Sequence, residues 1–558
     1  MKKFYVFSLL CCLSMALWAV PAKRVLHRLQ MTDGTTVRAM LYGDEHFSWY
    51  ETTDGRVLTE TEAGYVFSDE QPTEVRSKAR AARRANVLKI GSQAEAALPA
   101  QGSPRIPVIL VSFSDSVFHV EPLTDAWLMA YYDLYCNGTR DGQRYKGHGS
   151  YDAVREYFVD QSRGVFTPEF EVVAHVKLDN PESTYGRNSS SRKGSDAGFS
   201  ALCKDAVTKA MEQWQGDWMQ FSNRGKQRVD MALIIFAGCG EHEGADASLM
   251  WPKWSSLNVK VNDVTFHSAL CVSENMPILD DDDRVVDVEP EGIGVLCHEL
   301  NHALGLPDFY DTNYKAFGMD IWSIMDYGQY AGNGYTPVAM TAYEREFMGW
   351  EEIETLTSPG WYTLLPTSTT GKGYKIVNPE NANEYYVLEN RQRASWDNAV
   401  GRFGHGLMVT HVDYNASRWG NNSVNTDANH QRMTIIAANN RYVGTCVLNV
   451  TGNELIETWS GNLFPYEEND SLTANSVPAA TVLTSRGYMR QDLNAIMENE
   501  DEGKTVSFYF GNNYFVGIQA PEVQGIPSDN AVYDLSGRRV AKPGKGIYIV
   551  GGRKIVFQ

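Results

Sequence analysis

The residues most able to do chemistry lie in the run His298-Glu299-Leu300-Asn301-His302, which is followed by Gly305 and Asp308. Residues four apart lie on the same face of a helix, so the two histidines could hold one metal ion. Glu299 could reach a water molecule on that metal and act as a general base. Two imidazoles, a carboxylate and one open position form the ligand set of hydrolytic zinc. The sequence therefore predicts a hydrolytic zinc centre.

Asp308 is the expected third ligand. Gly305 can end the helix at a positive φ, so that the chain turns back and presents this carboxylate to the same ion. Asp311, close in sequence, and Glu344, on a later predicted helix, are the alternatives. Two histidines and a carboxylate also hold ferrous iron in oxygenases. The glutamate between the histidines, together with signs of export, favours zinc.

The elements that must position these residues belong to a predicted catalytic domain at residues 101–350. Hydrophobic periodicity predicts helices at 151–159, 200–212, 292–304 and 341–348, and strands at 106–113, 170–178 and 229–237. Mixed strands and long helices are typical of an α+β domain.

Two regions are expected before it. Residues 1–19 have the pattern of a signal peptide, with a basic start, an apolar core and a cleavage site at Leu17-Trp18-Ala19. Residues 20–100 are expected to be a β-rich propeptide and linker, because apolar and polar residues alternate between turn signals. Its basic stretch Arg76–Arg84 is either a solvated helix or linker, or an exposed site for an arginine-specific protease.

Two regions are expected after the catalytic domain. Residues 351–512 are predicted to be all-β, apart from one weak helix at 492–498. The expected strands lie at 361–365, 385–389, 407–414, 433–438 and 506–510. Residues 513–558 are predicted to hold a separate short β module.

Composition limits the partners. The chain has 558 residues, 43% of them hydrophobic, and a net charge of −19. Such acidity argues against nucleic acid or an anionic membrane as a partner. The expectation of protein or peptide substrates comes from the predicted zinc centre. The acidic run Asp280–Asp283 is expected to be a solvated loop, with calcium binding as the alternative.

The cysteines are widely and irregularly spaced. Of eight, six follow the predicted signal peptide, and their spacing favours neither a disulfide framework nor a Cys-type zinc site. Cys297, next to a predicted metal ligand, is expected to be a buried helix thiol.

The motif from His298 to Asp308, followed by Ser323-Ile324-Met325, resembles the metzincin metallopeptidases. In that clan a methionine turn forms a hydrophobic floor under the metal, and Met325 matches it. Tyr327 matches the tyrosine that stabilises the transition state in some metzincins. Most metzincins have histidine as the third ligand, so Asp308 narrows the resemblance to groups that use aspartate.

Wider features are similar to the immune-inhibitor-A-like secreted metallopeptidases, over about residues 25–510. They lie at 107–115, 154–158, 162–164, 237–244, 305–311 and 386–391. This resemblance implies a propeptide, a zincin-like endopeptidase domain and a β-rich following domain. The tail from Ala531 is similar to C-terminal sorting modules of Bacteroidetes-like bacteria, which implies type IX export and contact with secretion machinery.

The propeptide has no cysteine, which excludes latency through a cysteine on the zinc. Its acidic residues Asp33, Asp44 and Asp54 are open candidates for capping the metal.

The sequence thus favours a secreted zinc endopeptidase made as a precursor. The alternatives are a non-catalytic surface or matrix-binding protein on a protease scaffold, and a zinc amidase acting on glycan-linked peptides. The complete set of His298, Glu299, His302 and Asp308 favours an enzyme, because a decayed site usually loses the glutamate or a ligand.

Overall fold

The computed structural model describes two compact units, Met1–Asn512 and Asn513–Gln558, with mixed α and β structure. The described residues are 17–61, 63–86, 96–119, 124–139, 150–189, 192–244, 246–445, 452–512, 514, 531–550 and 553–557. Within these ranges, no helix has the length and apolar character needed to cross a membrane. Most of the predicted signal peptide lies outside the described residues.

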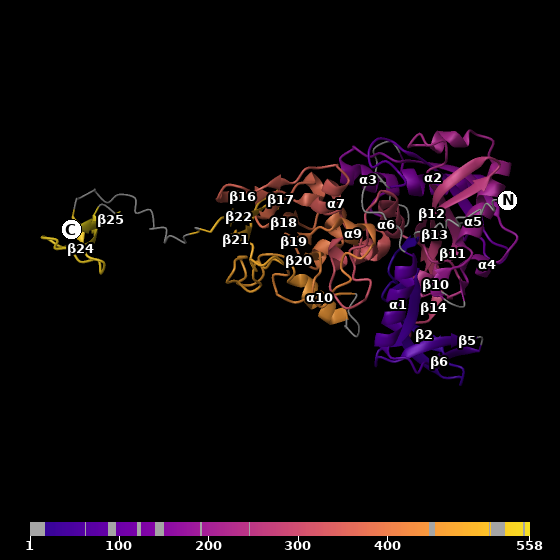
Figure 1. Ribbon diagram of the computed structural model, residues 1–558, viewed down its shortest axis with the longest axis horizontal. Helices are drawn as coiled ribbons and strands as arrows, with labels where there is room; N and C mark the ends of the chain where they lie inside the picture. Colours follow the sequence, from indigo (N-terminus) through magenta and orange to yellow (C-terminus); the bar gives the residue numbers. More distant parts are fainter. Residues whose placement is uncertain are drawn as a thin grey trace, which may run out of the picture. The chain divides into compact units, whose positions relative to one another are not determined.

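A seven-stranded sheet is the scaffold of the first unit (Figure 1). Its order is β1 (Leu17–Ala19), β12 (Lys253–Val261), β13 (Val264–Leu279), β11 (Ala232–Cys239), β7 (Arg105–Ser112) and β8 (Glu169–Lys177), with β14 (Val285–Pro290) paired to β13. The neighbours from β13 to β8 run parallel, whereas β12 is antiparallel to β13. Among the strands that the structure describes, the short β1 pairs with the outer edge of β12.

The sheet buries both of its faces. In β7, Val108 and Leu110 belong to one core, and Ile109 and Val111 belong to another. Helices α2 (Asp125–Asn137), α3 (Val154–Ser162) and α6 (Gly294–Ala303) contribute residues to the first core, and α5 (Phe199–Gln213) to the second. Burial on both faces accounts for the continuous apolar runs of the parallel strands.

The predicted elements of this region are present. The helices expected at 151–159, 200–212, 292–304 and 341–348 correspond to α3, α5, α6 and α7 (Ala342–Phe347), and the three expected strands to β7, β8 and β11. Helix α2 and the hairpin β12–β13 were missed. In β13 the consecutive polar residues Ser273, Glu274 and Asn275 are all buried, so the strand lacks an apolar pattern there.

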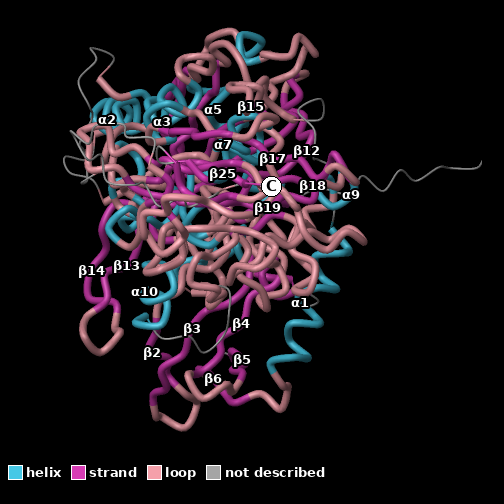
Figure 2. Tube along the Cα trace, turned by 90° about the vertical axis from the view of Figure 1, so that its left-hand side faces the viewer, coloured by secondary structure: helices cyan, strands magenta, loops and turns pink. Residues whose placement is uncertain are grey.

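The N-terminal module is a five-stranded antiparallel sheet with one helix. Its elements are β2 (Leu26–Gln30), β3 (Thr36–Asp44), β4 (Phe47–Thr52), β5 (Val57–Thr61), β6 (Gly64–Phe67) and α1 (Pro72–Asn86). Figures 1 and 2 show α1 beside this sheet. The basic stretch Arg76–Arg84 lies in α1, and residues 87–95 after it are not described.

Ion pairs join this module to the turn between β13 and β14. Arg38 pairs with Asp283, and Arg28 lies 3.7 Å from Asp282. The carboxylate of Asp280 accepts backbone hydrogen bonds within the turn. The acidic run is therefore an ion-pairing turn in this structure, and calcium binding there is untested.

Residues 351–512 hold two sheets. The first contains β15 (Glu354–Thr355), β17 (Tyr374–Asn378), β18 (Asn381–Arg391), β19 (Gly406–Asp413) and β20 (Met433–Ile435), and the second β16 (Gly360–Leu364), β22 (Val506–Phe510) and β21 (Leu493–Glu498). The all-β prediction is too simple, since helices also occur: α8 (Thr367–Thr370), α9 (Ala416–Gly420) and α10 (Gly452–Ser460).

The helix predicted at 492–498 is wrong, because this segment is strand β21. The register with β22 shifts between Asn494 and Met497, and Ala495 has a φ of 49°. Such a bulge adds one residue to the strand. The buried residues Leu493 and Ile496 are therefore three apart, which mimics helical spacing.

The cysteines that the structure describes are thiols. They are Cys136, Cys203, Cys239, Cys271 and Cys297. Cys297 is fully buried in α6 as predicted, and burial holds the pKa of its thiol well above the ordinary value. Cys446 lies outside the described residues.

The second unit contains a three-stranded antiparallel sheet. Its strands are β23 (Val532–Tyr533), β24 (Gly546–Val550) and β25 (Arg553–Phe557). These strands lie in the segment that the sequence analysis assigned to a separate C-terminal module.

Because the two units are separately compact, a chain that ends at Asn512 should retain the stability of the first unit. We expect its thermal midpoint in calorimetry to differ from that of the full chain by less than about 2 °C. A loss of more than about 5 °C would show that the C-terminal unit supports the first.

Candidate metal centre

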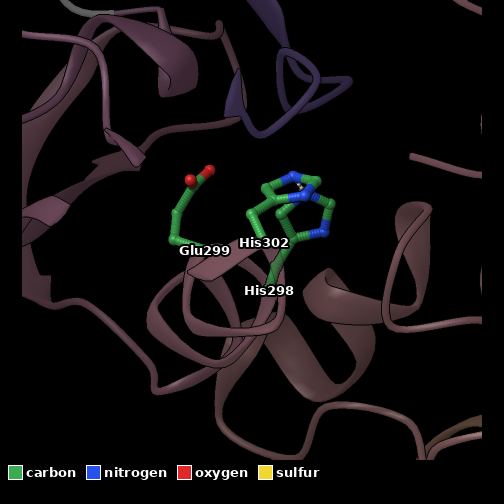
Figure 3. A group of neighbouring side chains, drawn as sticks. All are labelled: His298, Glu299 and His302. Atoms are coloured by element: carbon green, nitrogen blue, oxygen red, sulfur yellow. Dashed lines mark hydrogen bonds between the residues drawn. The ribbon is translucent and has the colours of Figure 1, made fainter. Parts of the chain in front are cut away.

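Helix α6 brings His298 and His302 together, with their Nε2 atoms 3.0 Å apart (Figure 3). The Nδ1 atom of His298 lies 2.8 Å from the carbonyl oxygen of Ile324, and that of His302 lies 2.8 Å from the carbonyl oxygen of Leu306. A carbonyl oxygen can only accept a hydrogen bond, so each neutral ring carries its proton on Nδ1. Both Nε2 lone pairs are then available to a cation.

Asp308 completes the group. Its Oδ1 atom lies 3.3 Å from the Nε2 atom of each histidine. The chain turns after α6 at Gly305, whose φ is 106°, as expected. Burial opposes ionisation of Asp308, but the imidazoles of His302 and His298 hold the pKa of this carboxyl well below its ordinary value. Burial lowers the pKa of His298, which favours its neutral, ligating form.

These three atoms fit a four-coordinate metal. Ligands at zinc bond lengths of 2.0–2.1 Å in tetrahedral geometry lie about 3.3 Å apart. The observed separations are 3.0, 3.3 and 3.3 Å. With both ring protons held on Nδ1, three buried acceptor atoms face one another, and such an arrangement requires a cation. The site therefore suits a divalent transition metal.

The two alternative third ligands make other contacts. The carboxylate of Asp311 accepts hydrogen bonds from the backbone N–H groups of Asn313 and Lys315. Glu344 accepts a hydrogen bond of 2.6 Å from the Thr341 N–H and thus caps helix α7. The structure brings Asp308 to the histidines in preference to these residues.

Glu299 faces the same space as the histidines (Figure 3). Ligand atoms of Glu299, His298 and His302 all lie within 4.8 Å of one another. Its Oε2 atom accepts a hydrogen bond of 2.7 Å from the backbone N–H of Trp254 on β12. Burial raises the pKa of Glu299 well above the ordinary value, and the charges of Glu45 and Asp308 raise it further. A raised carboxyl pKa suits a general base that works near neutral pH.

The turn that contains Met325 adjoins both parts of the centre. The side chain of Met325 is fully buried, and its carbonyl oxygen accepts a hydrogen bond of 2.8 Å from the N–H of Phe309, next to Asp308. The preceding Ile324 carbonyl orients His298. The hydroxyl of Tyr327 donates to the carbonyl oxygen of Ala22 at 3.2 Å.

Asn422 is a positioning residue that the sequence analysis missed. Its Oδ1 atom accepts a hydrogen bond of 2.7 Å from the Asp308 N–H, and its Nδ2 group donates to Asp308 Oδ2. Asn422 is buried just after helix α9, 114 residues from Asp308. No local pattern marks it, because its role arises only when the β-rich region packs on the catalytic domain.

The segment of residues 20–22 contacts the centre through Tyr327, and in Figure 3 indigo ribbon from the N-terminal part of the chain lies above the side chains. The carbonyl oxygens of this segment accept hydrogen bonds from the Trp251 indole (Val20, 3.0 Å) and the Tyr330 hydroxyl (Pro21, 2.7 Å). Val20 is fully buried.

The acidic residues considered for capping the metal make local contacts. Asp33 accepts hydrogen bonds from Thr35, and Asp54 accepts one from Thr52. The carboxylate of Asp44 accepts the N–H of His46 at 2.9 Å. The contact between the N-terminal module and the centre therefore includes the backbone of residues 20–22 and the buried Glu45 between β3 and β4, whose charge raises the pKa of Glu299.

Comparison with known proteins places this centre in a peptidase context. Residues 96–352 match the family profile described as "Immune inhibitor A peptidase M6, catalytic domain". Immune inhibitor A of Bacillus thuringiensis subsp. alesti is 28% identical over 225 residues, 35% of this chain and 31% of the relative. The pre-pro-metalloprotease PrtV of Vibrio cholerae serotype O1 is 22% identical over 272 residues, 44% of this chain and 29% of the relative.

The match thus spans about a third of the length of these relatives. The family profile and both relatives support a metallopeptidase function, and this family implies a metal. The whole chain's activity, substrates and partners remain matters of proposal.

Replacing Asn422 by alanine should weaken metal binding about 10- to 100-fold, because Asp308 loses the group that orients it. Metal affinity can be measured by competition with a chromophoric chelator. Asn421→Ala is the matched control, since the Asn421 amide donates to Ser417 on α9 and should leave affinity unchanged. Equal affinities for both variants would contradict the role assigned to Asn422.

Proposed function

We propose that this protein is a secreted zinc-dependent endopeptidase, made as a latent precursor. The observation that carries the proposal is the meeting of His298, His302 and Asp308 at tetrahedral-ligand spacing beside Glu299. The similarity of residues 96–352 to a peptidase catalytic domain supports it. We further infer that the centre is of the metzincin type, with Met325 as its methionine turn.

In this proposal His298, His302 and Asp308 hold the metal. Zinc, when bound, polarises a carbonyl group and acidifies water. The carboxylate of Glu299 takes a proton from the attacking water and passes it to the leaving amide nitrogen. The Tyr327 hydroxyl, which here donates to a peptide carbonyl, would donate to the carbonyl of the bond being cleaved.

Strand β12 is the expected substrate-binding edge. Within the described residues, its outer side pairs with the three residues of β1, the end of the predicted signal peptide, in antiparallel register. Once the N-terminal segment leaves, the N–H and C=O groups of that edge can pair with an extended peptide. Trp254 on β12 also contacts Glu299, so a peptide on this edge would lie beside the general base.

The N-terminal segment accounts for the proposed latency. Residues 20–22 use their backbone carbonyls to bind Trp251, Tyr330 and Tyr327, in the place where a substrate would lie. Cleavage at the basic stretch ending in Arg84, near the C-terminal end of α1, would separate this module from the enzyme.

Secretion is inferred from the N-terminal signal pattern, and type IX export from the similarity of residues 531–558 to sorting modules. The binding-protein and glycan-peptide amidase alternatives predict no hydrolysis of an unfolded protein, so activity on casein separates them from the proposed function.

The variant Glu299→Ala should lose about 10²- to 10⁴-fold of the casein-hydrolysing activity of the enzyme processed after Arg84, because the proton acceptor is gone. A chelator should abolish wild-type activity and added zinc should restore it. The variant should keep one zinc per chain in metal analysis. A zinc-loaded, folded variant as active as the wild type would disprove this role.

The intact precursor should hydrolyse casein at least about tenfold more slowly than the processed enzyme, because residues 20–22 occupy the cleft. Initial rates on fluorescent casein, measured before and after cleavage at Arg84, give this ratio. Equal rates for the two forms would contradict latency, even with full peptidase activity.

A further inference from the structure

A second group of buried polar side chains lies near the metal centre, and the mechanism above does not use it. It consists of His242, Glu243 and Glu291, whose ligand atoms lie within 4.8 Å of one another. The Nε2 atom of His242 is 3.2 Å from Glu291 Oε1, and the Ser273 hydroxyl donates to Glu291 Oε2. Two carboxylates buried this closely require a positive charge nearby.

Lys23 of the N-terminal segment supplies that charge. Its Nζ atom lies 2.8 Å from Glu243 Oε1 and 3.4 Å from the sulfur of Met276. It also lies 5.8 Å from the ring centre of Tyr330, within the range of a cation–π contact. A carboxylate, an aromatic face and a thioether together form a pocket with the chemistry of a lysine-binding site.

The pocket lies next to the residues that would contact the backbone of a bound substrate. The backbone N–H of Lys23 donates to the carbonyl oxygen of His242 at 2.8 Å. The residue before it, Ala22, receives the hydroxyl of Tyr327, and the hydroxyl of Tyr330 binds Pro21. Lys23 is therefore one residue beyond the contact with Tyr327, and its side chain enters the acidic pocket.

Release of the segment leaves the pocket without its cation. With Lys23 in place, Glu243 is 2% exposed and Glu291 5% exposed, so in the precursor this cation rather than water compensates Glu243. Burial raises the pKa of Glu243, Lys23 lowers it, and Glu291 raises it again. A cationic side chain entering from a peptide would restore the lost interaction, whereas an acidic side chain would add a third negative charge.

Resting on the proposed peptidase function, we infer that Glu243, with Glu291 and Tyr330, forms a specificity pocket that selects peptides with a lysine or arginine side chain. Lys23 occupies this pocket in the precursor in the way a substrate side chain does in the processed enzyme. Glu243 thus sets substrate choice and takes no part in the chemical step.

Cleavage of a proteome-derived peptide library by the enzyme processed after Arg84, read by mass spectrometry, tests this inference. Lysine and arginine should be enriched at one fixed position relative to the cleaved bond. For peptides that differ only there, kcat/KM should be at least about tenfold higher with lysine than with norleucine. Glu243→Gln should remove this preference and change kcat/KM for the norleucine peptide less than about threefold.

Glu384→Gln is the matched control. Glu384 is equally buried but pairs with His411 at 2.9 Å in the β-rich region, so its replacement should leave the preference intact. Cleavage without a basic preference in the wild type, or a preference that survives in Glu243→Gln, would overturn the inference.

A binding measurement separates this inference from the peptidase proposal. The probe is a labelled peptide with the sequence of residues 20–28, or the same peptide with norleucine at Lys23, added to the processed Glu299→Ala protein. The lysine peptide should bind at least about tenfold more tightly in fluorescence polarisation. If the lysine peptide binds tightly but the wild-type enzyme hydrolyses no peptide, the inferred pocket stands and the peptidase proposal is rejected.

Equal affinity of the two peptides would reject the pocket, whatever the activity. A second bound metal in the processed enzyme, lost in Glu243→Gln, would also overturn the inference, because the group would then be a metal site.

Discussion

The arrangement around the metal centre depends on one electrostatic constraint: three buried acceptor atoms lie within 3.3 Å of one another and need a cation between them. Each of the three side chains that carry these atoms is held in position by hydrogen bonds to other groups. Backbone carbonyls of Ile324 and Leu306 fix the two imidazoles, and Asn422 fixes the carboxylate of Asp308. The repulsion among these atoms is thus resisted by the catalytic domain and the β-rich region together, and binding of a cation would stabilise the contact between them.

The sheet imposes a second constraint, which concerns its edge. An uncovered edge strand exposes backbone hydrogen-bonding groups that invite another strand. In β12 this edge lies beside Glu299, the proposed general base, because the backbone N–H of Trp254 donates to that carboxylate. The unpaired backbone groups that would let β12 bind a peptide would therefore also let it pair with a strand of another chain. In this structure β1, the end of the predicted signal peptide, pairs with that edge, and its removal with the signal peptide would leave the edge open to a peptide.

The sequence was sufficient where chemistry is local. The spacing of His298 and His302, the turn at Gly305 and the helix over 292–304 all follow from short-range geometry, and the structure has them. The sequence-based prediction failed for elements whose secondary structure depends on tertiary packing. The bulge in β21 imitated helical spacing, and buried polar residues concealed β13.

The same distinction applies to the site. The residues at 298–308 are close in sequence and could be assigned as a group. Asn422 and Lys23 act across more than 100 residues, and each is a common residue type in an unremarkable local context. Their functions exist only as contacts, so a single sequence carries no signal for them.

Charge links the N-terminal segment to the centre more firmly than backbone contacts do. Backbone hydrogen bonds made by residues 20–22 can be exchanged for water when the segment leaves. The ion pair between Lys23 and Glu243 is not exchanged so easily, because its loss leaves the carboxylates of Glu243 and Glu291 close together without that cation. Part of the cost of releasing the segment is therefore the cost of leaving this pocket without a cation. A basic peptide that replaces Lys23 removes that cost, so substrate binding and loss of the N-terminal module should favour each other.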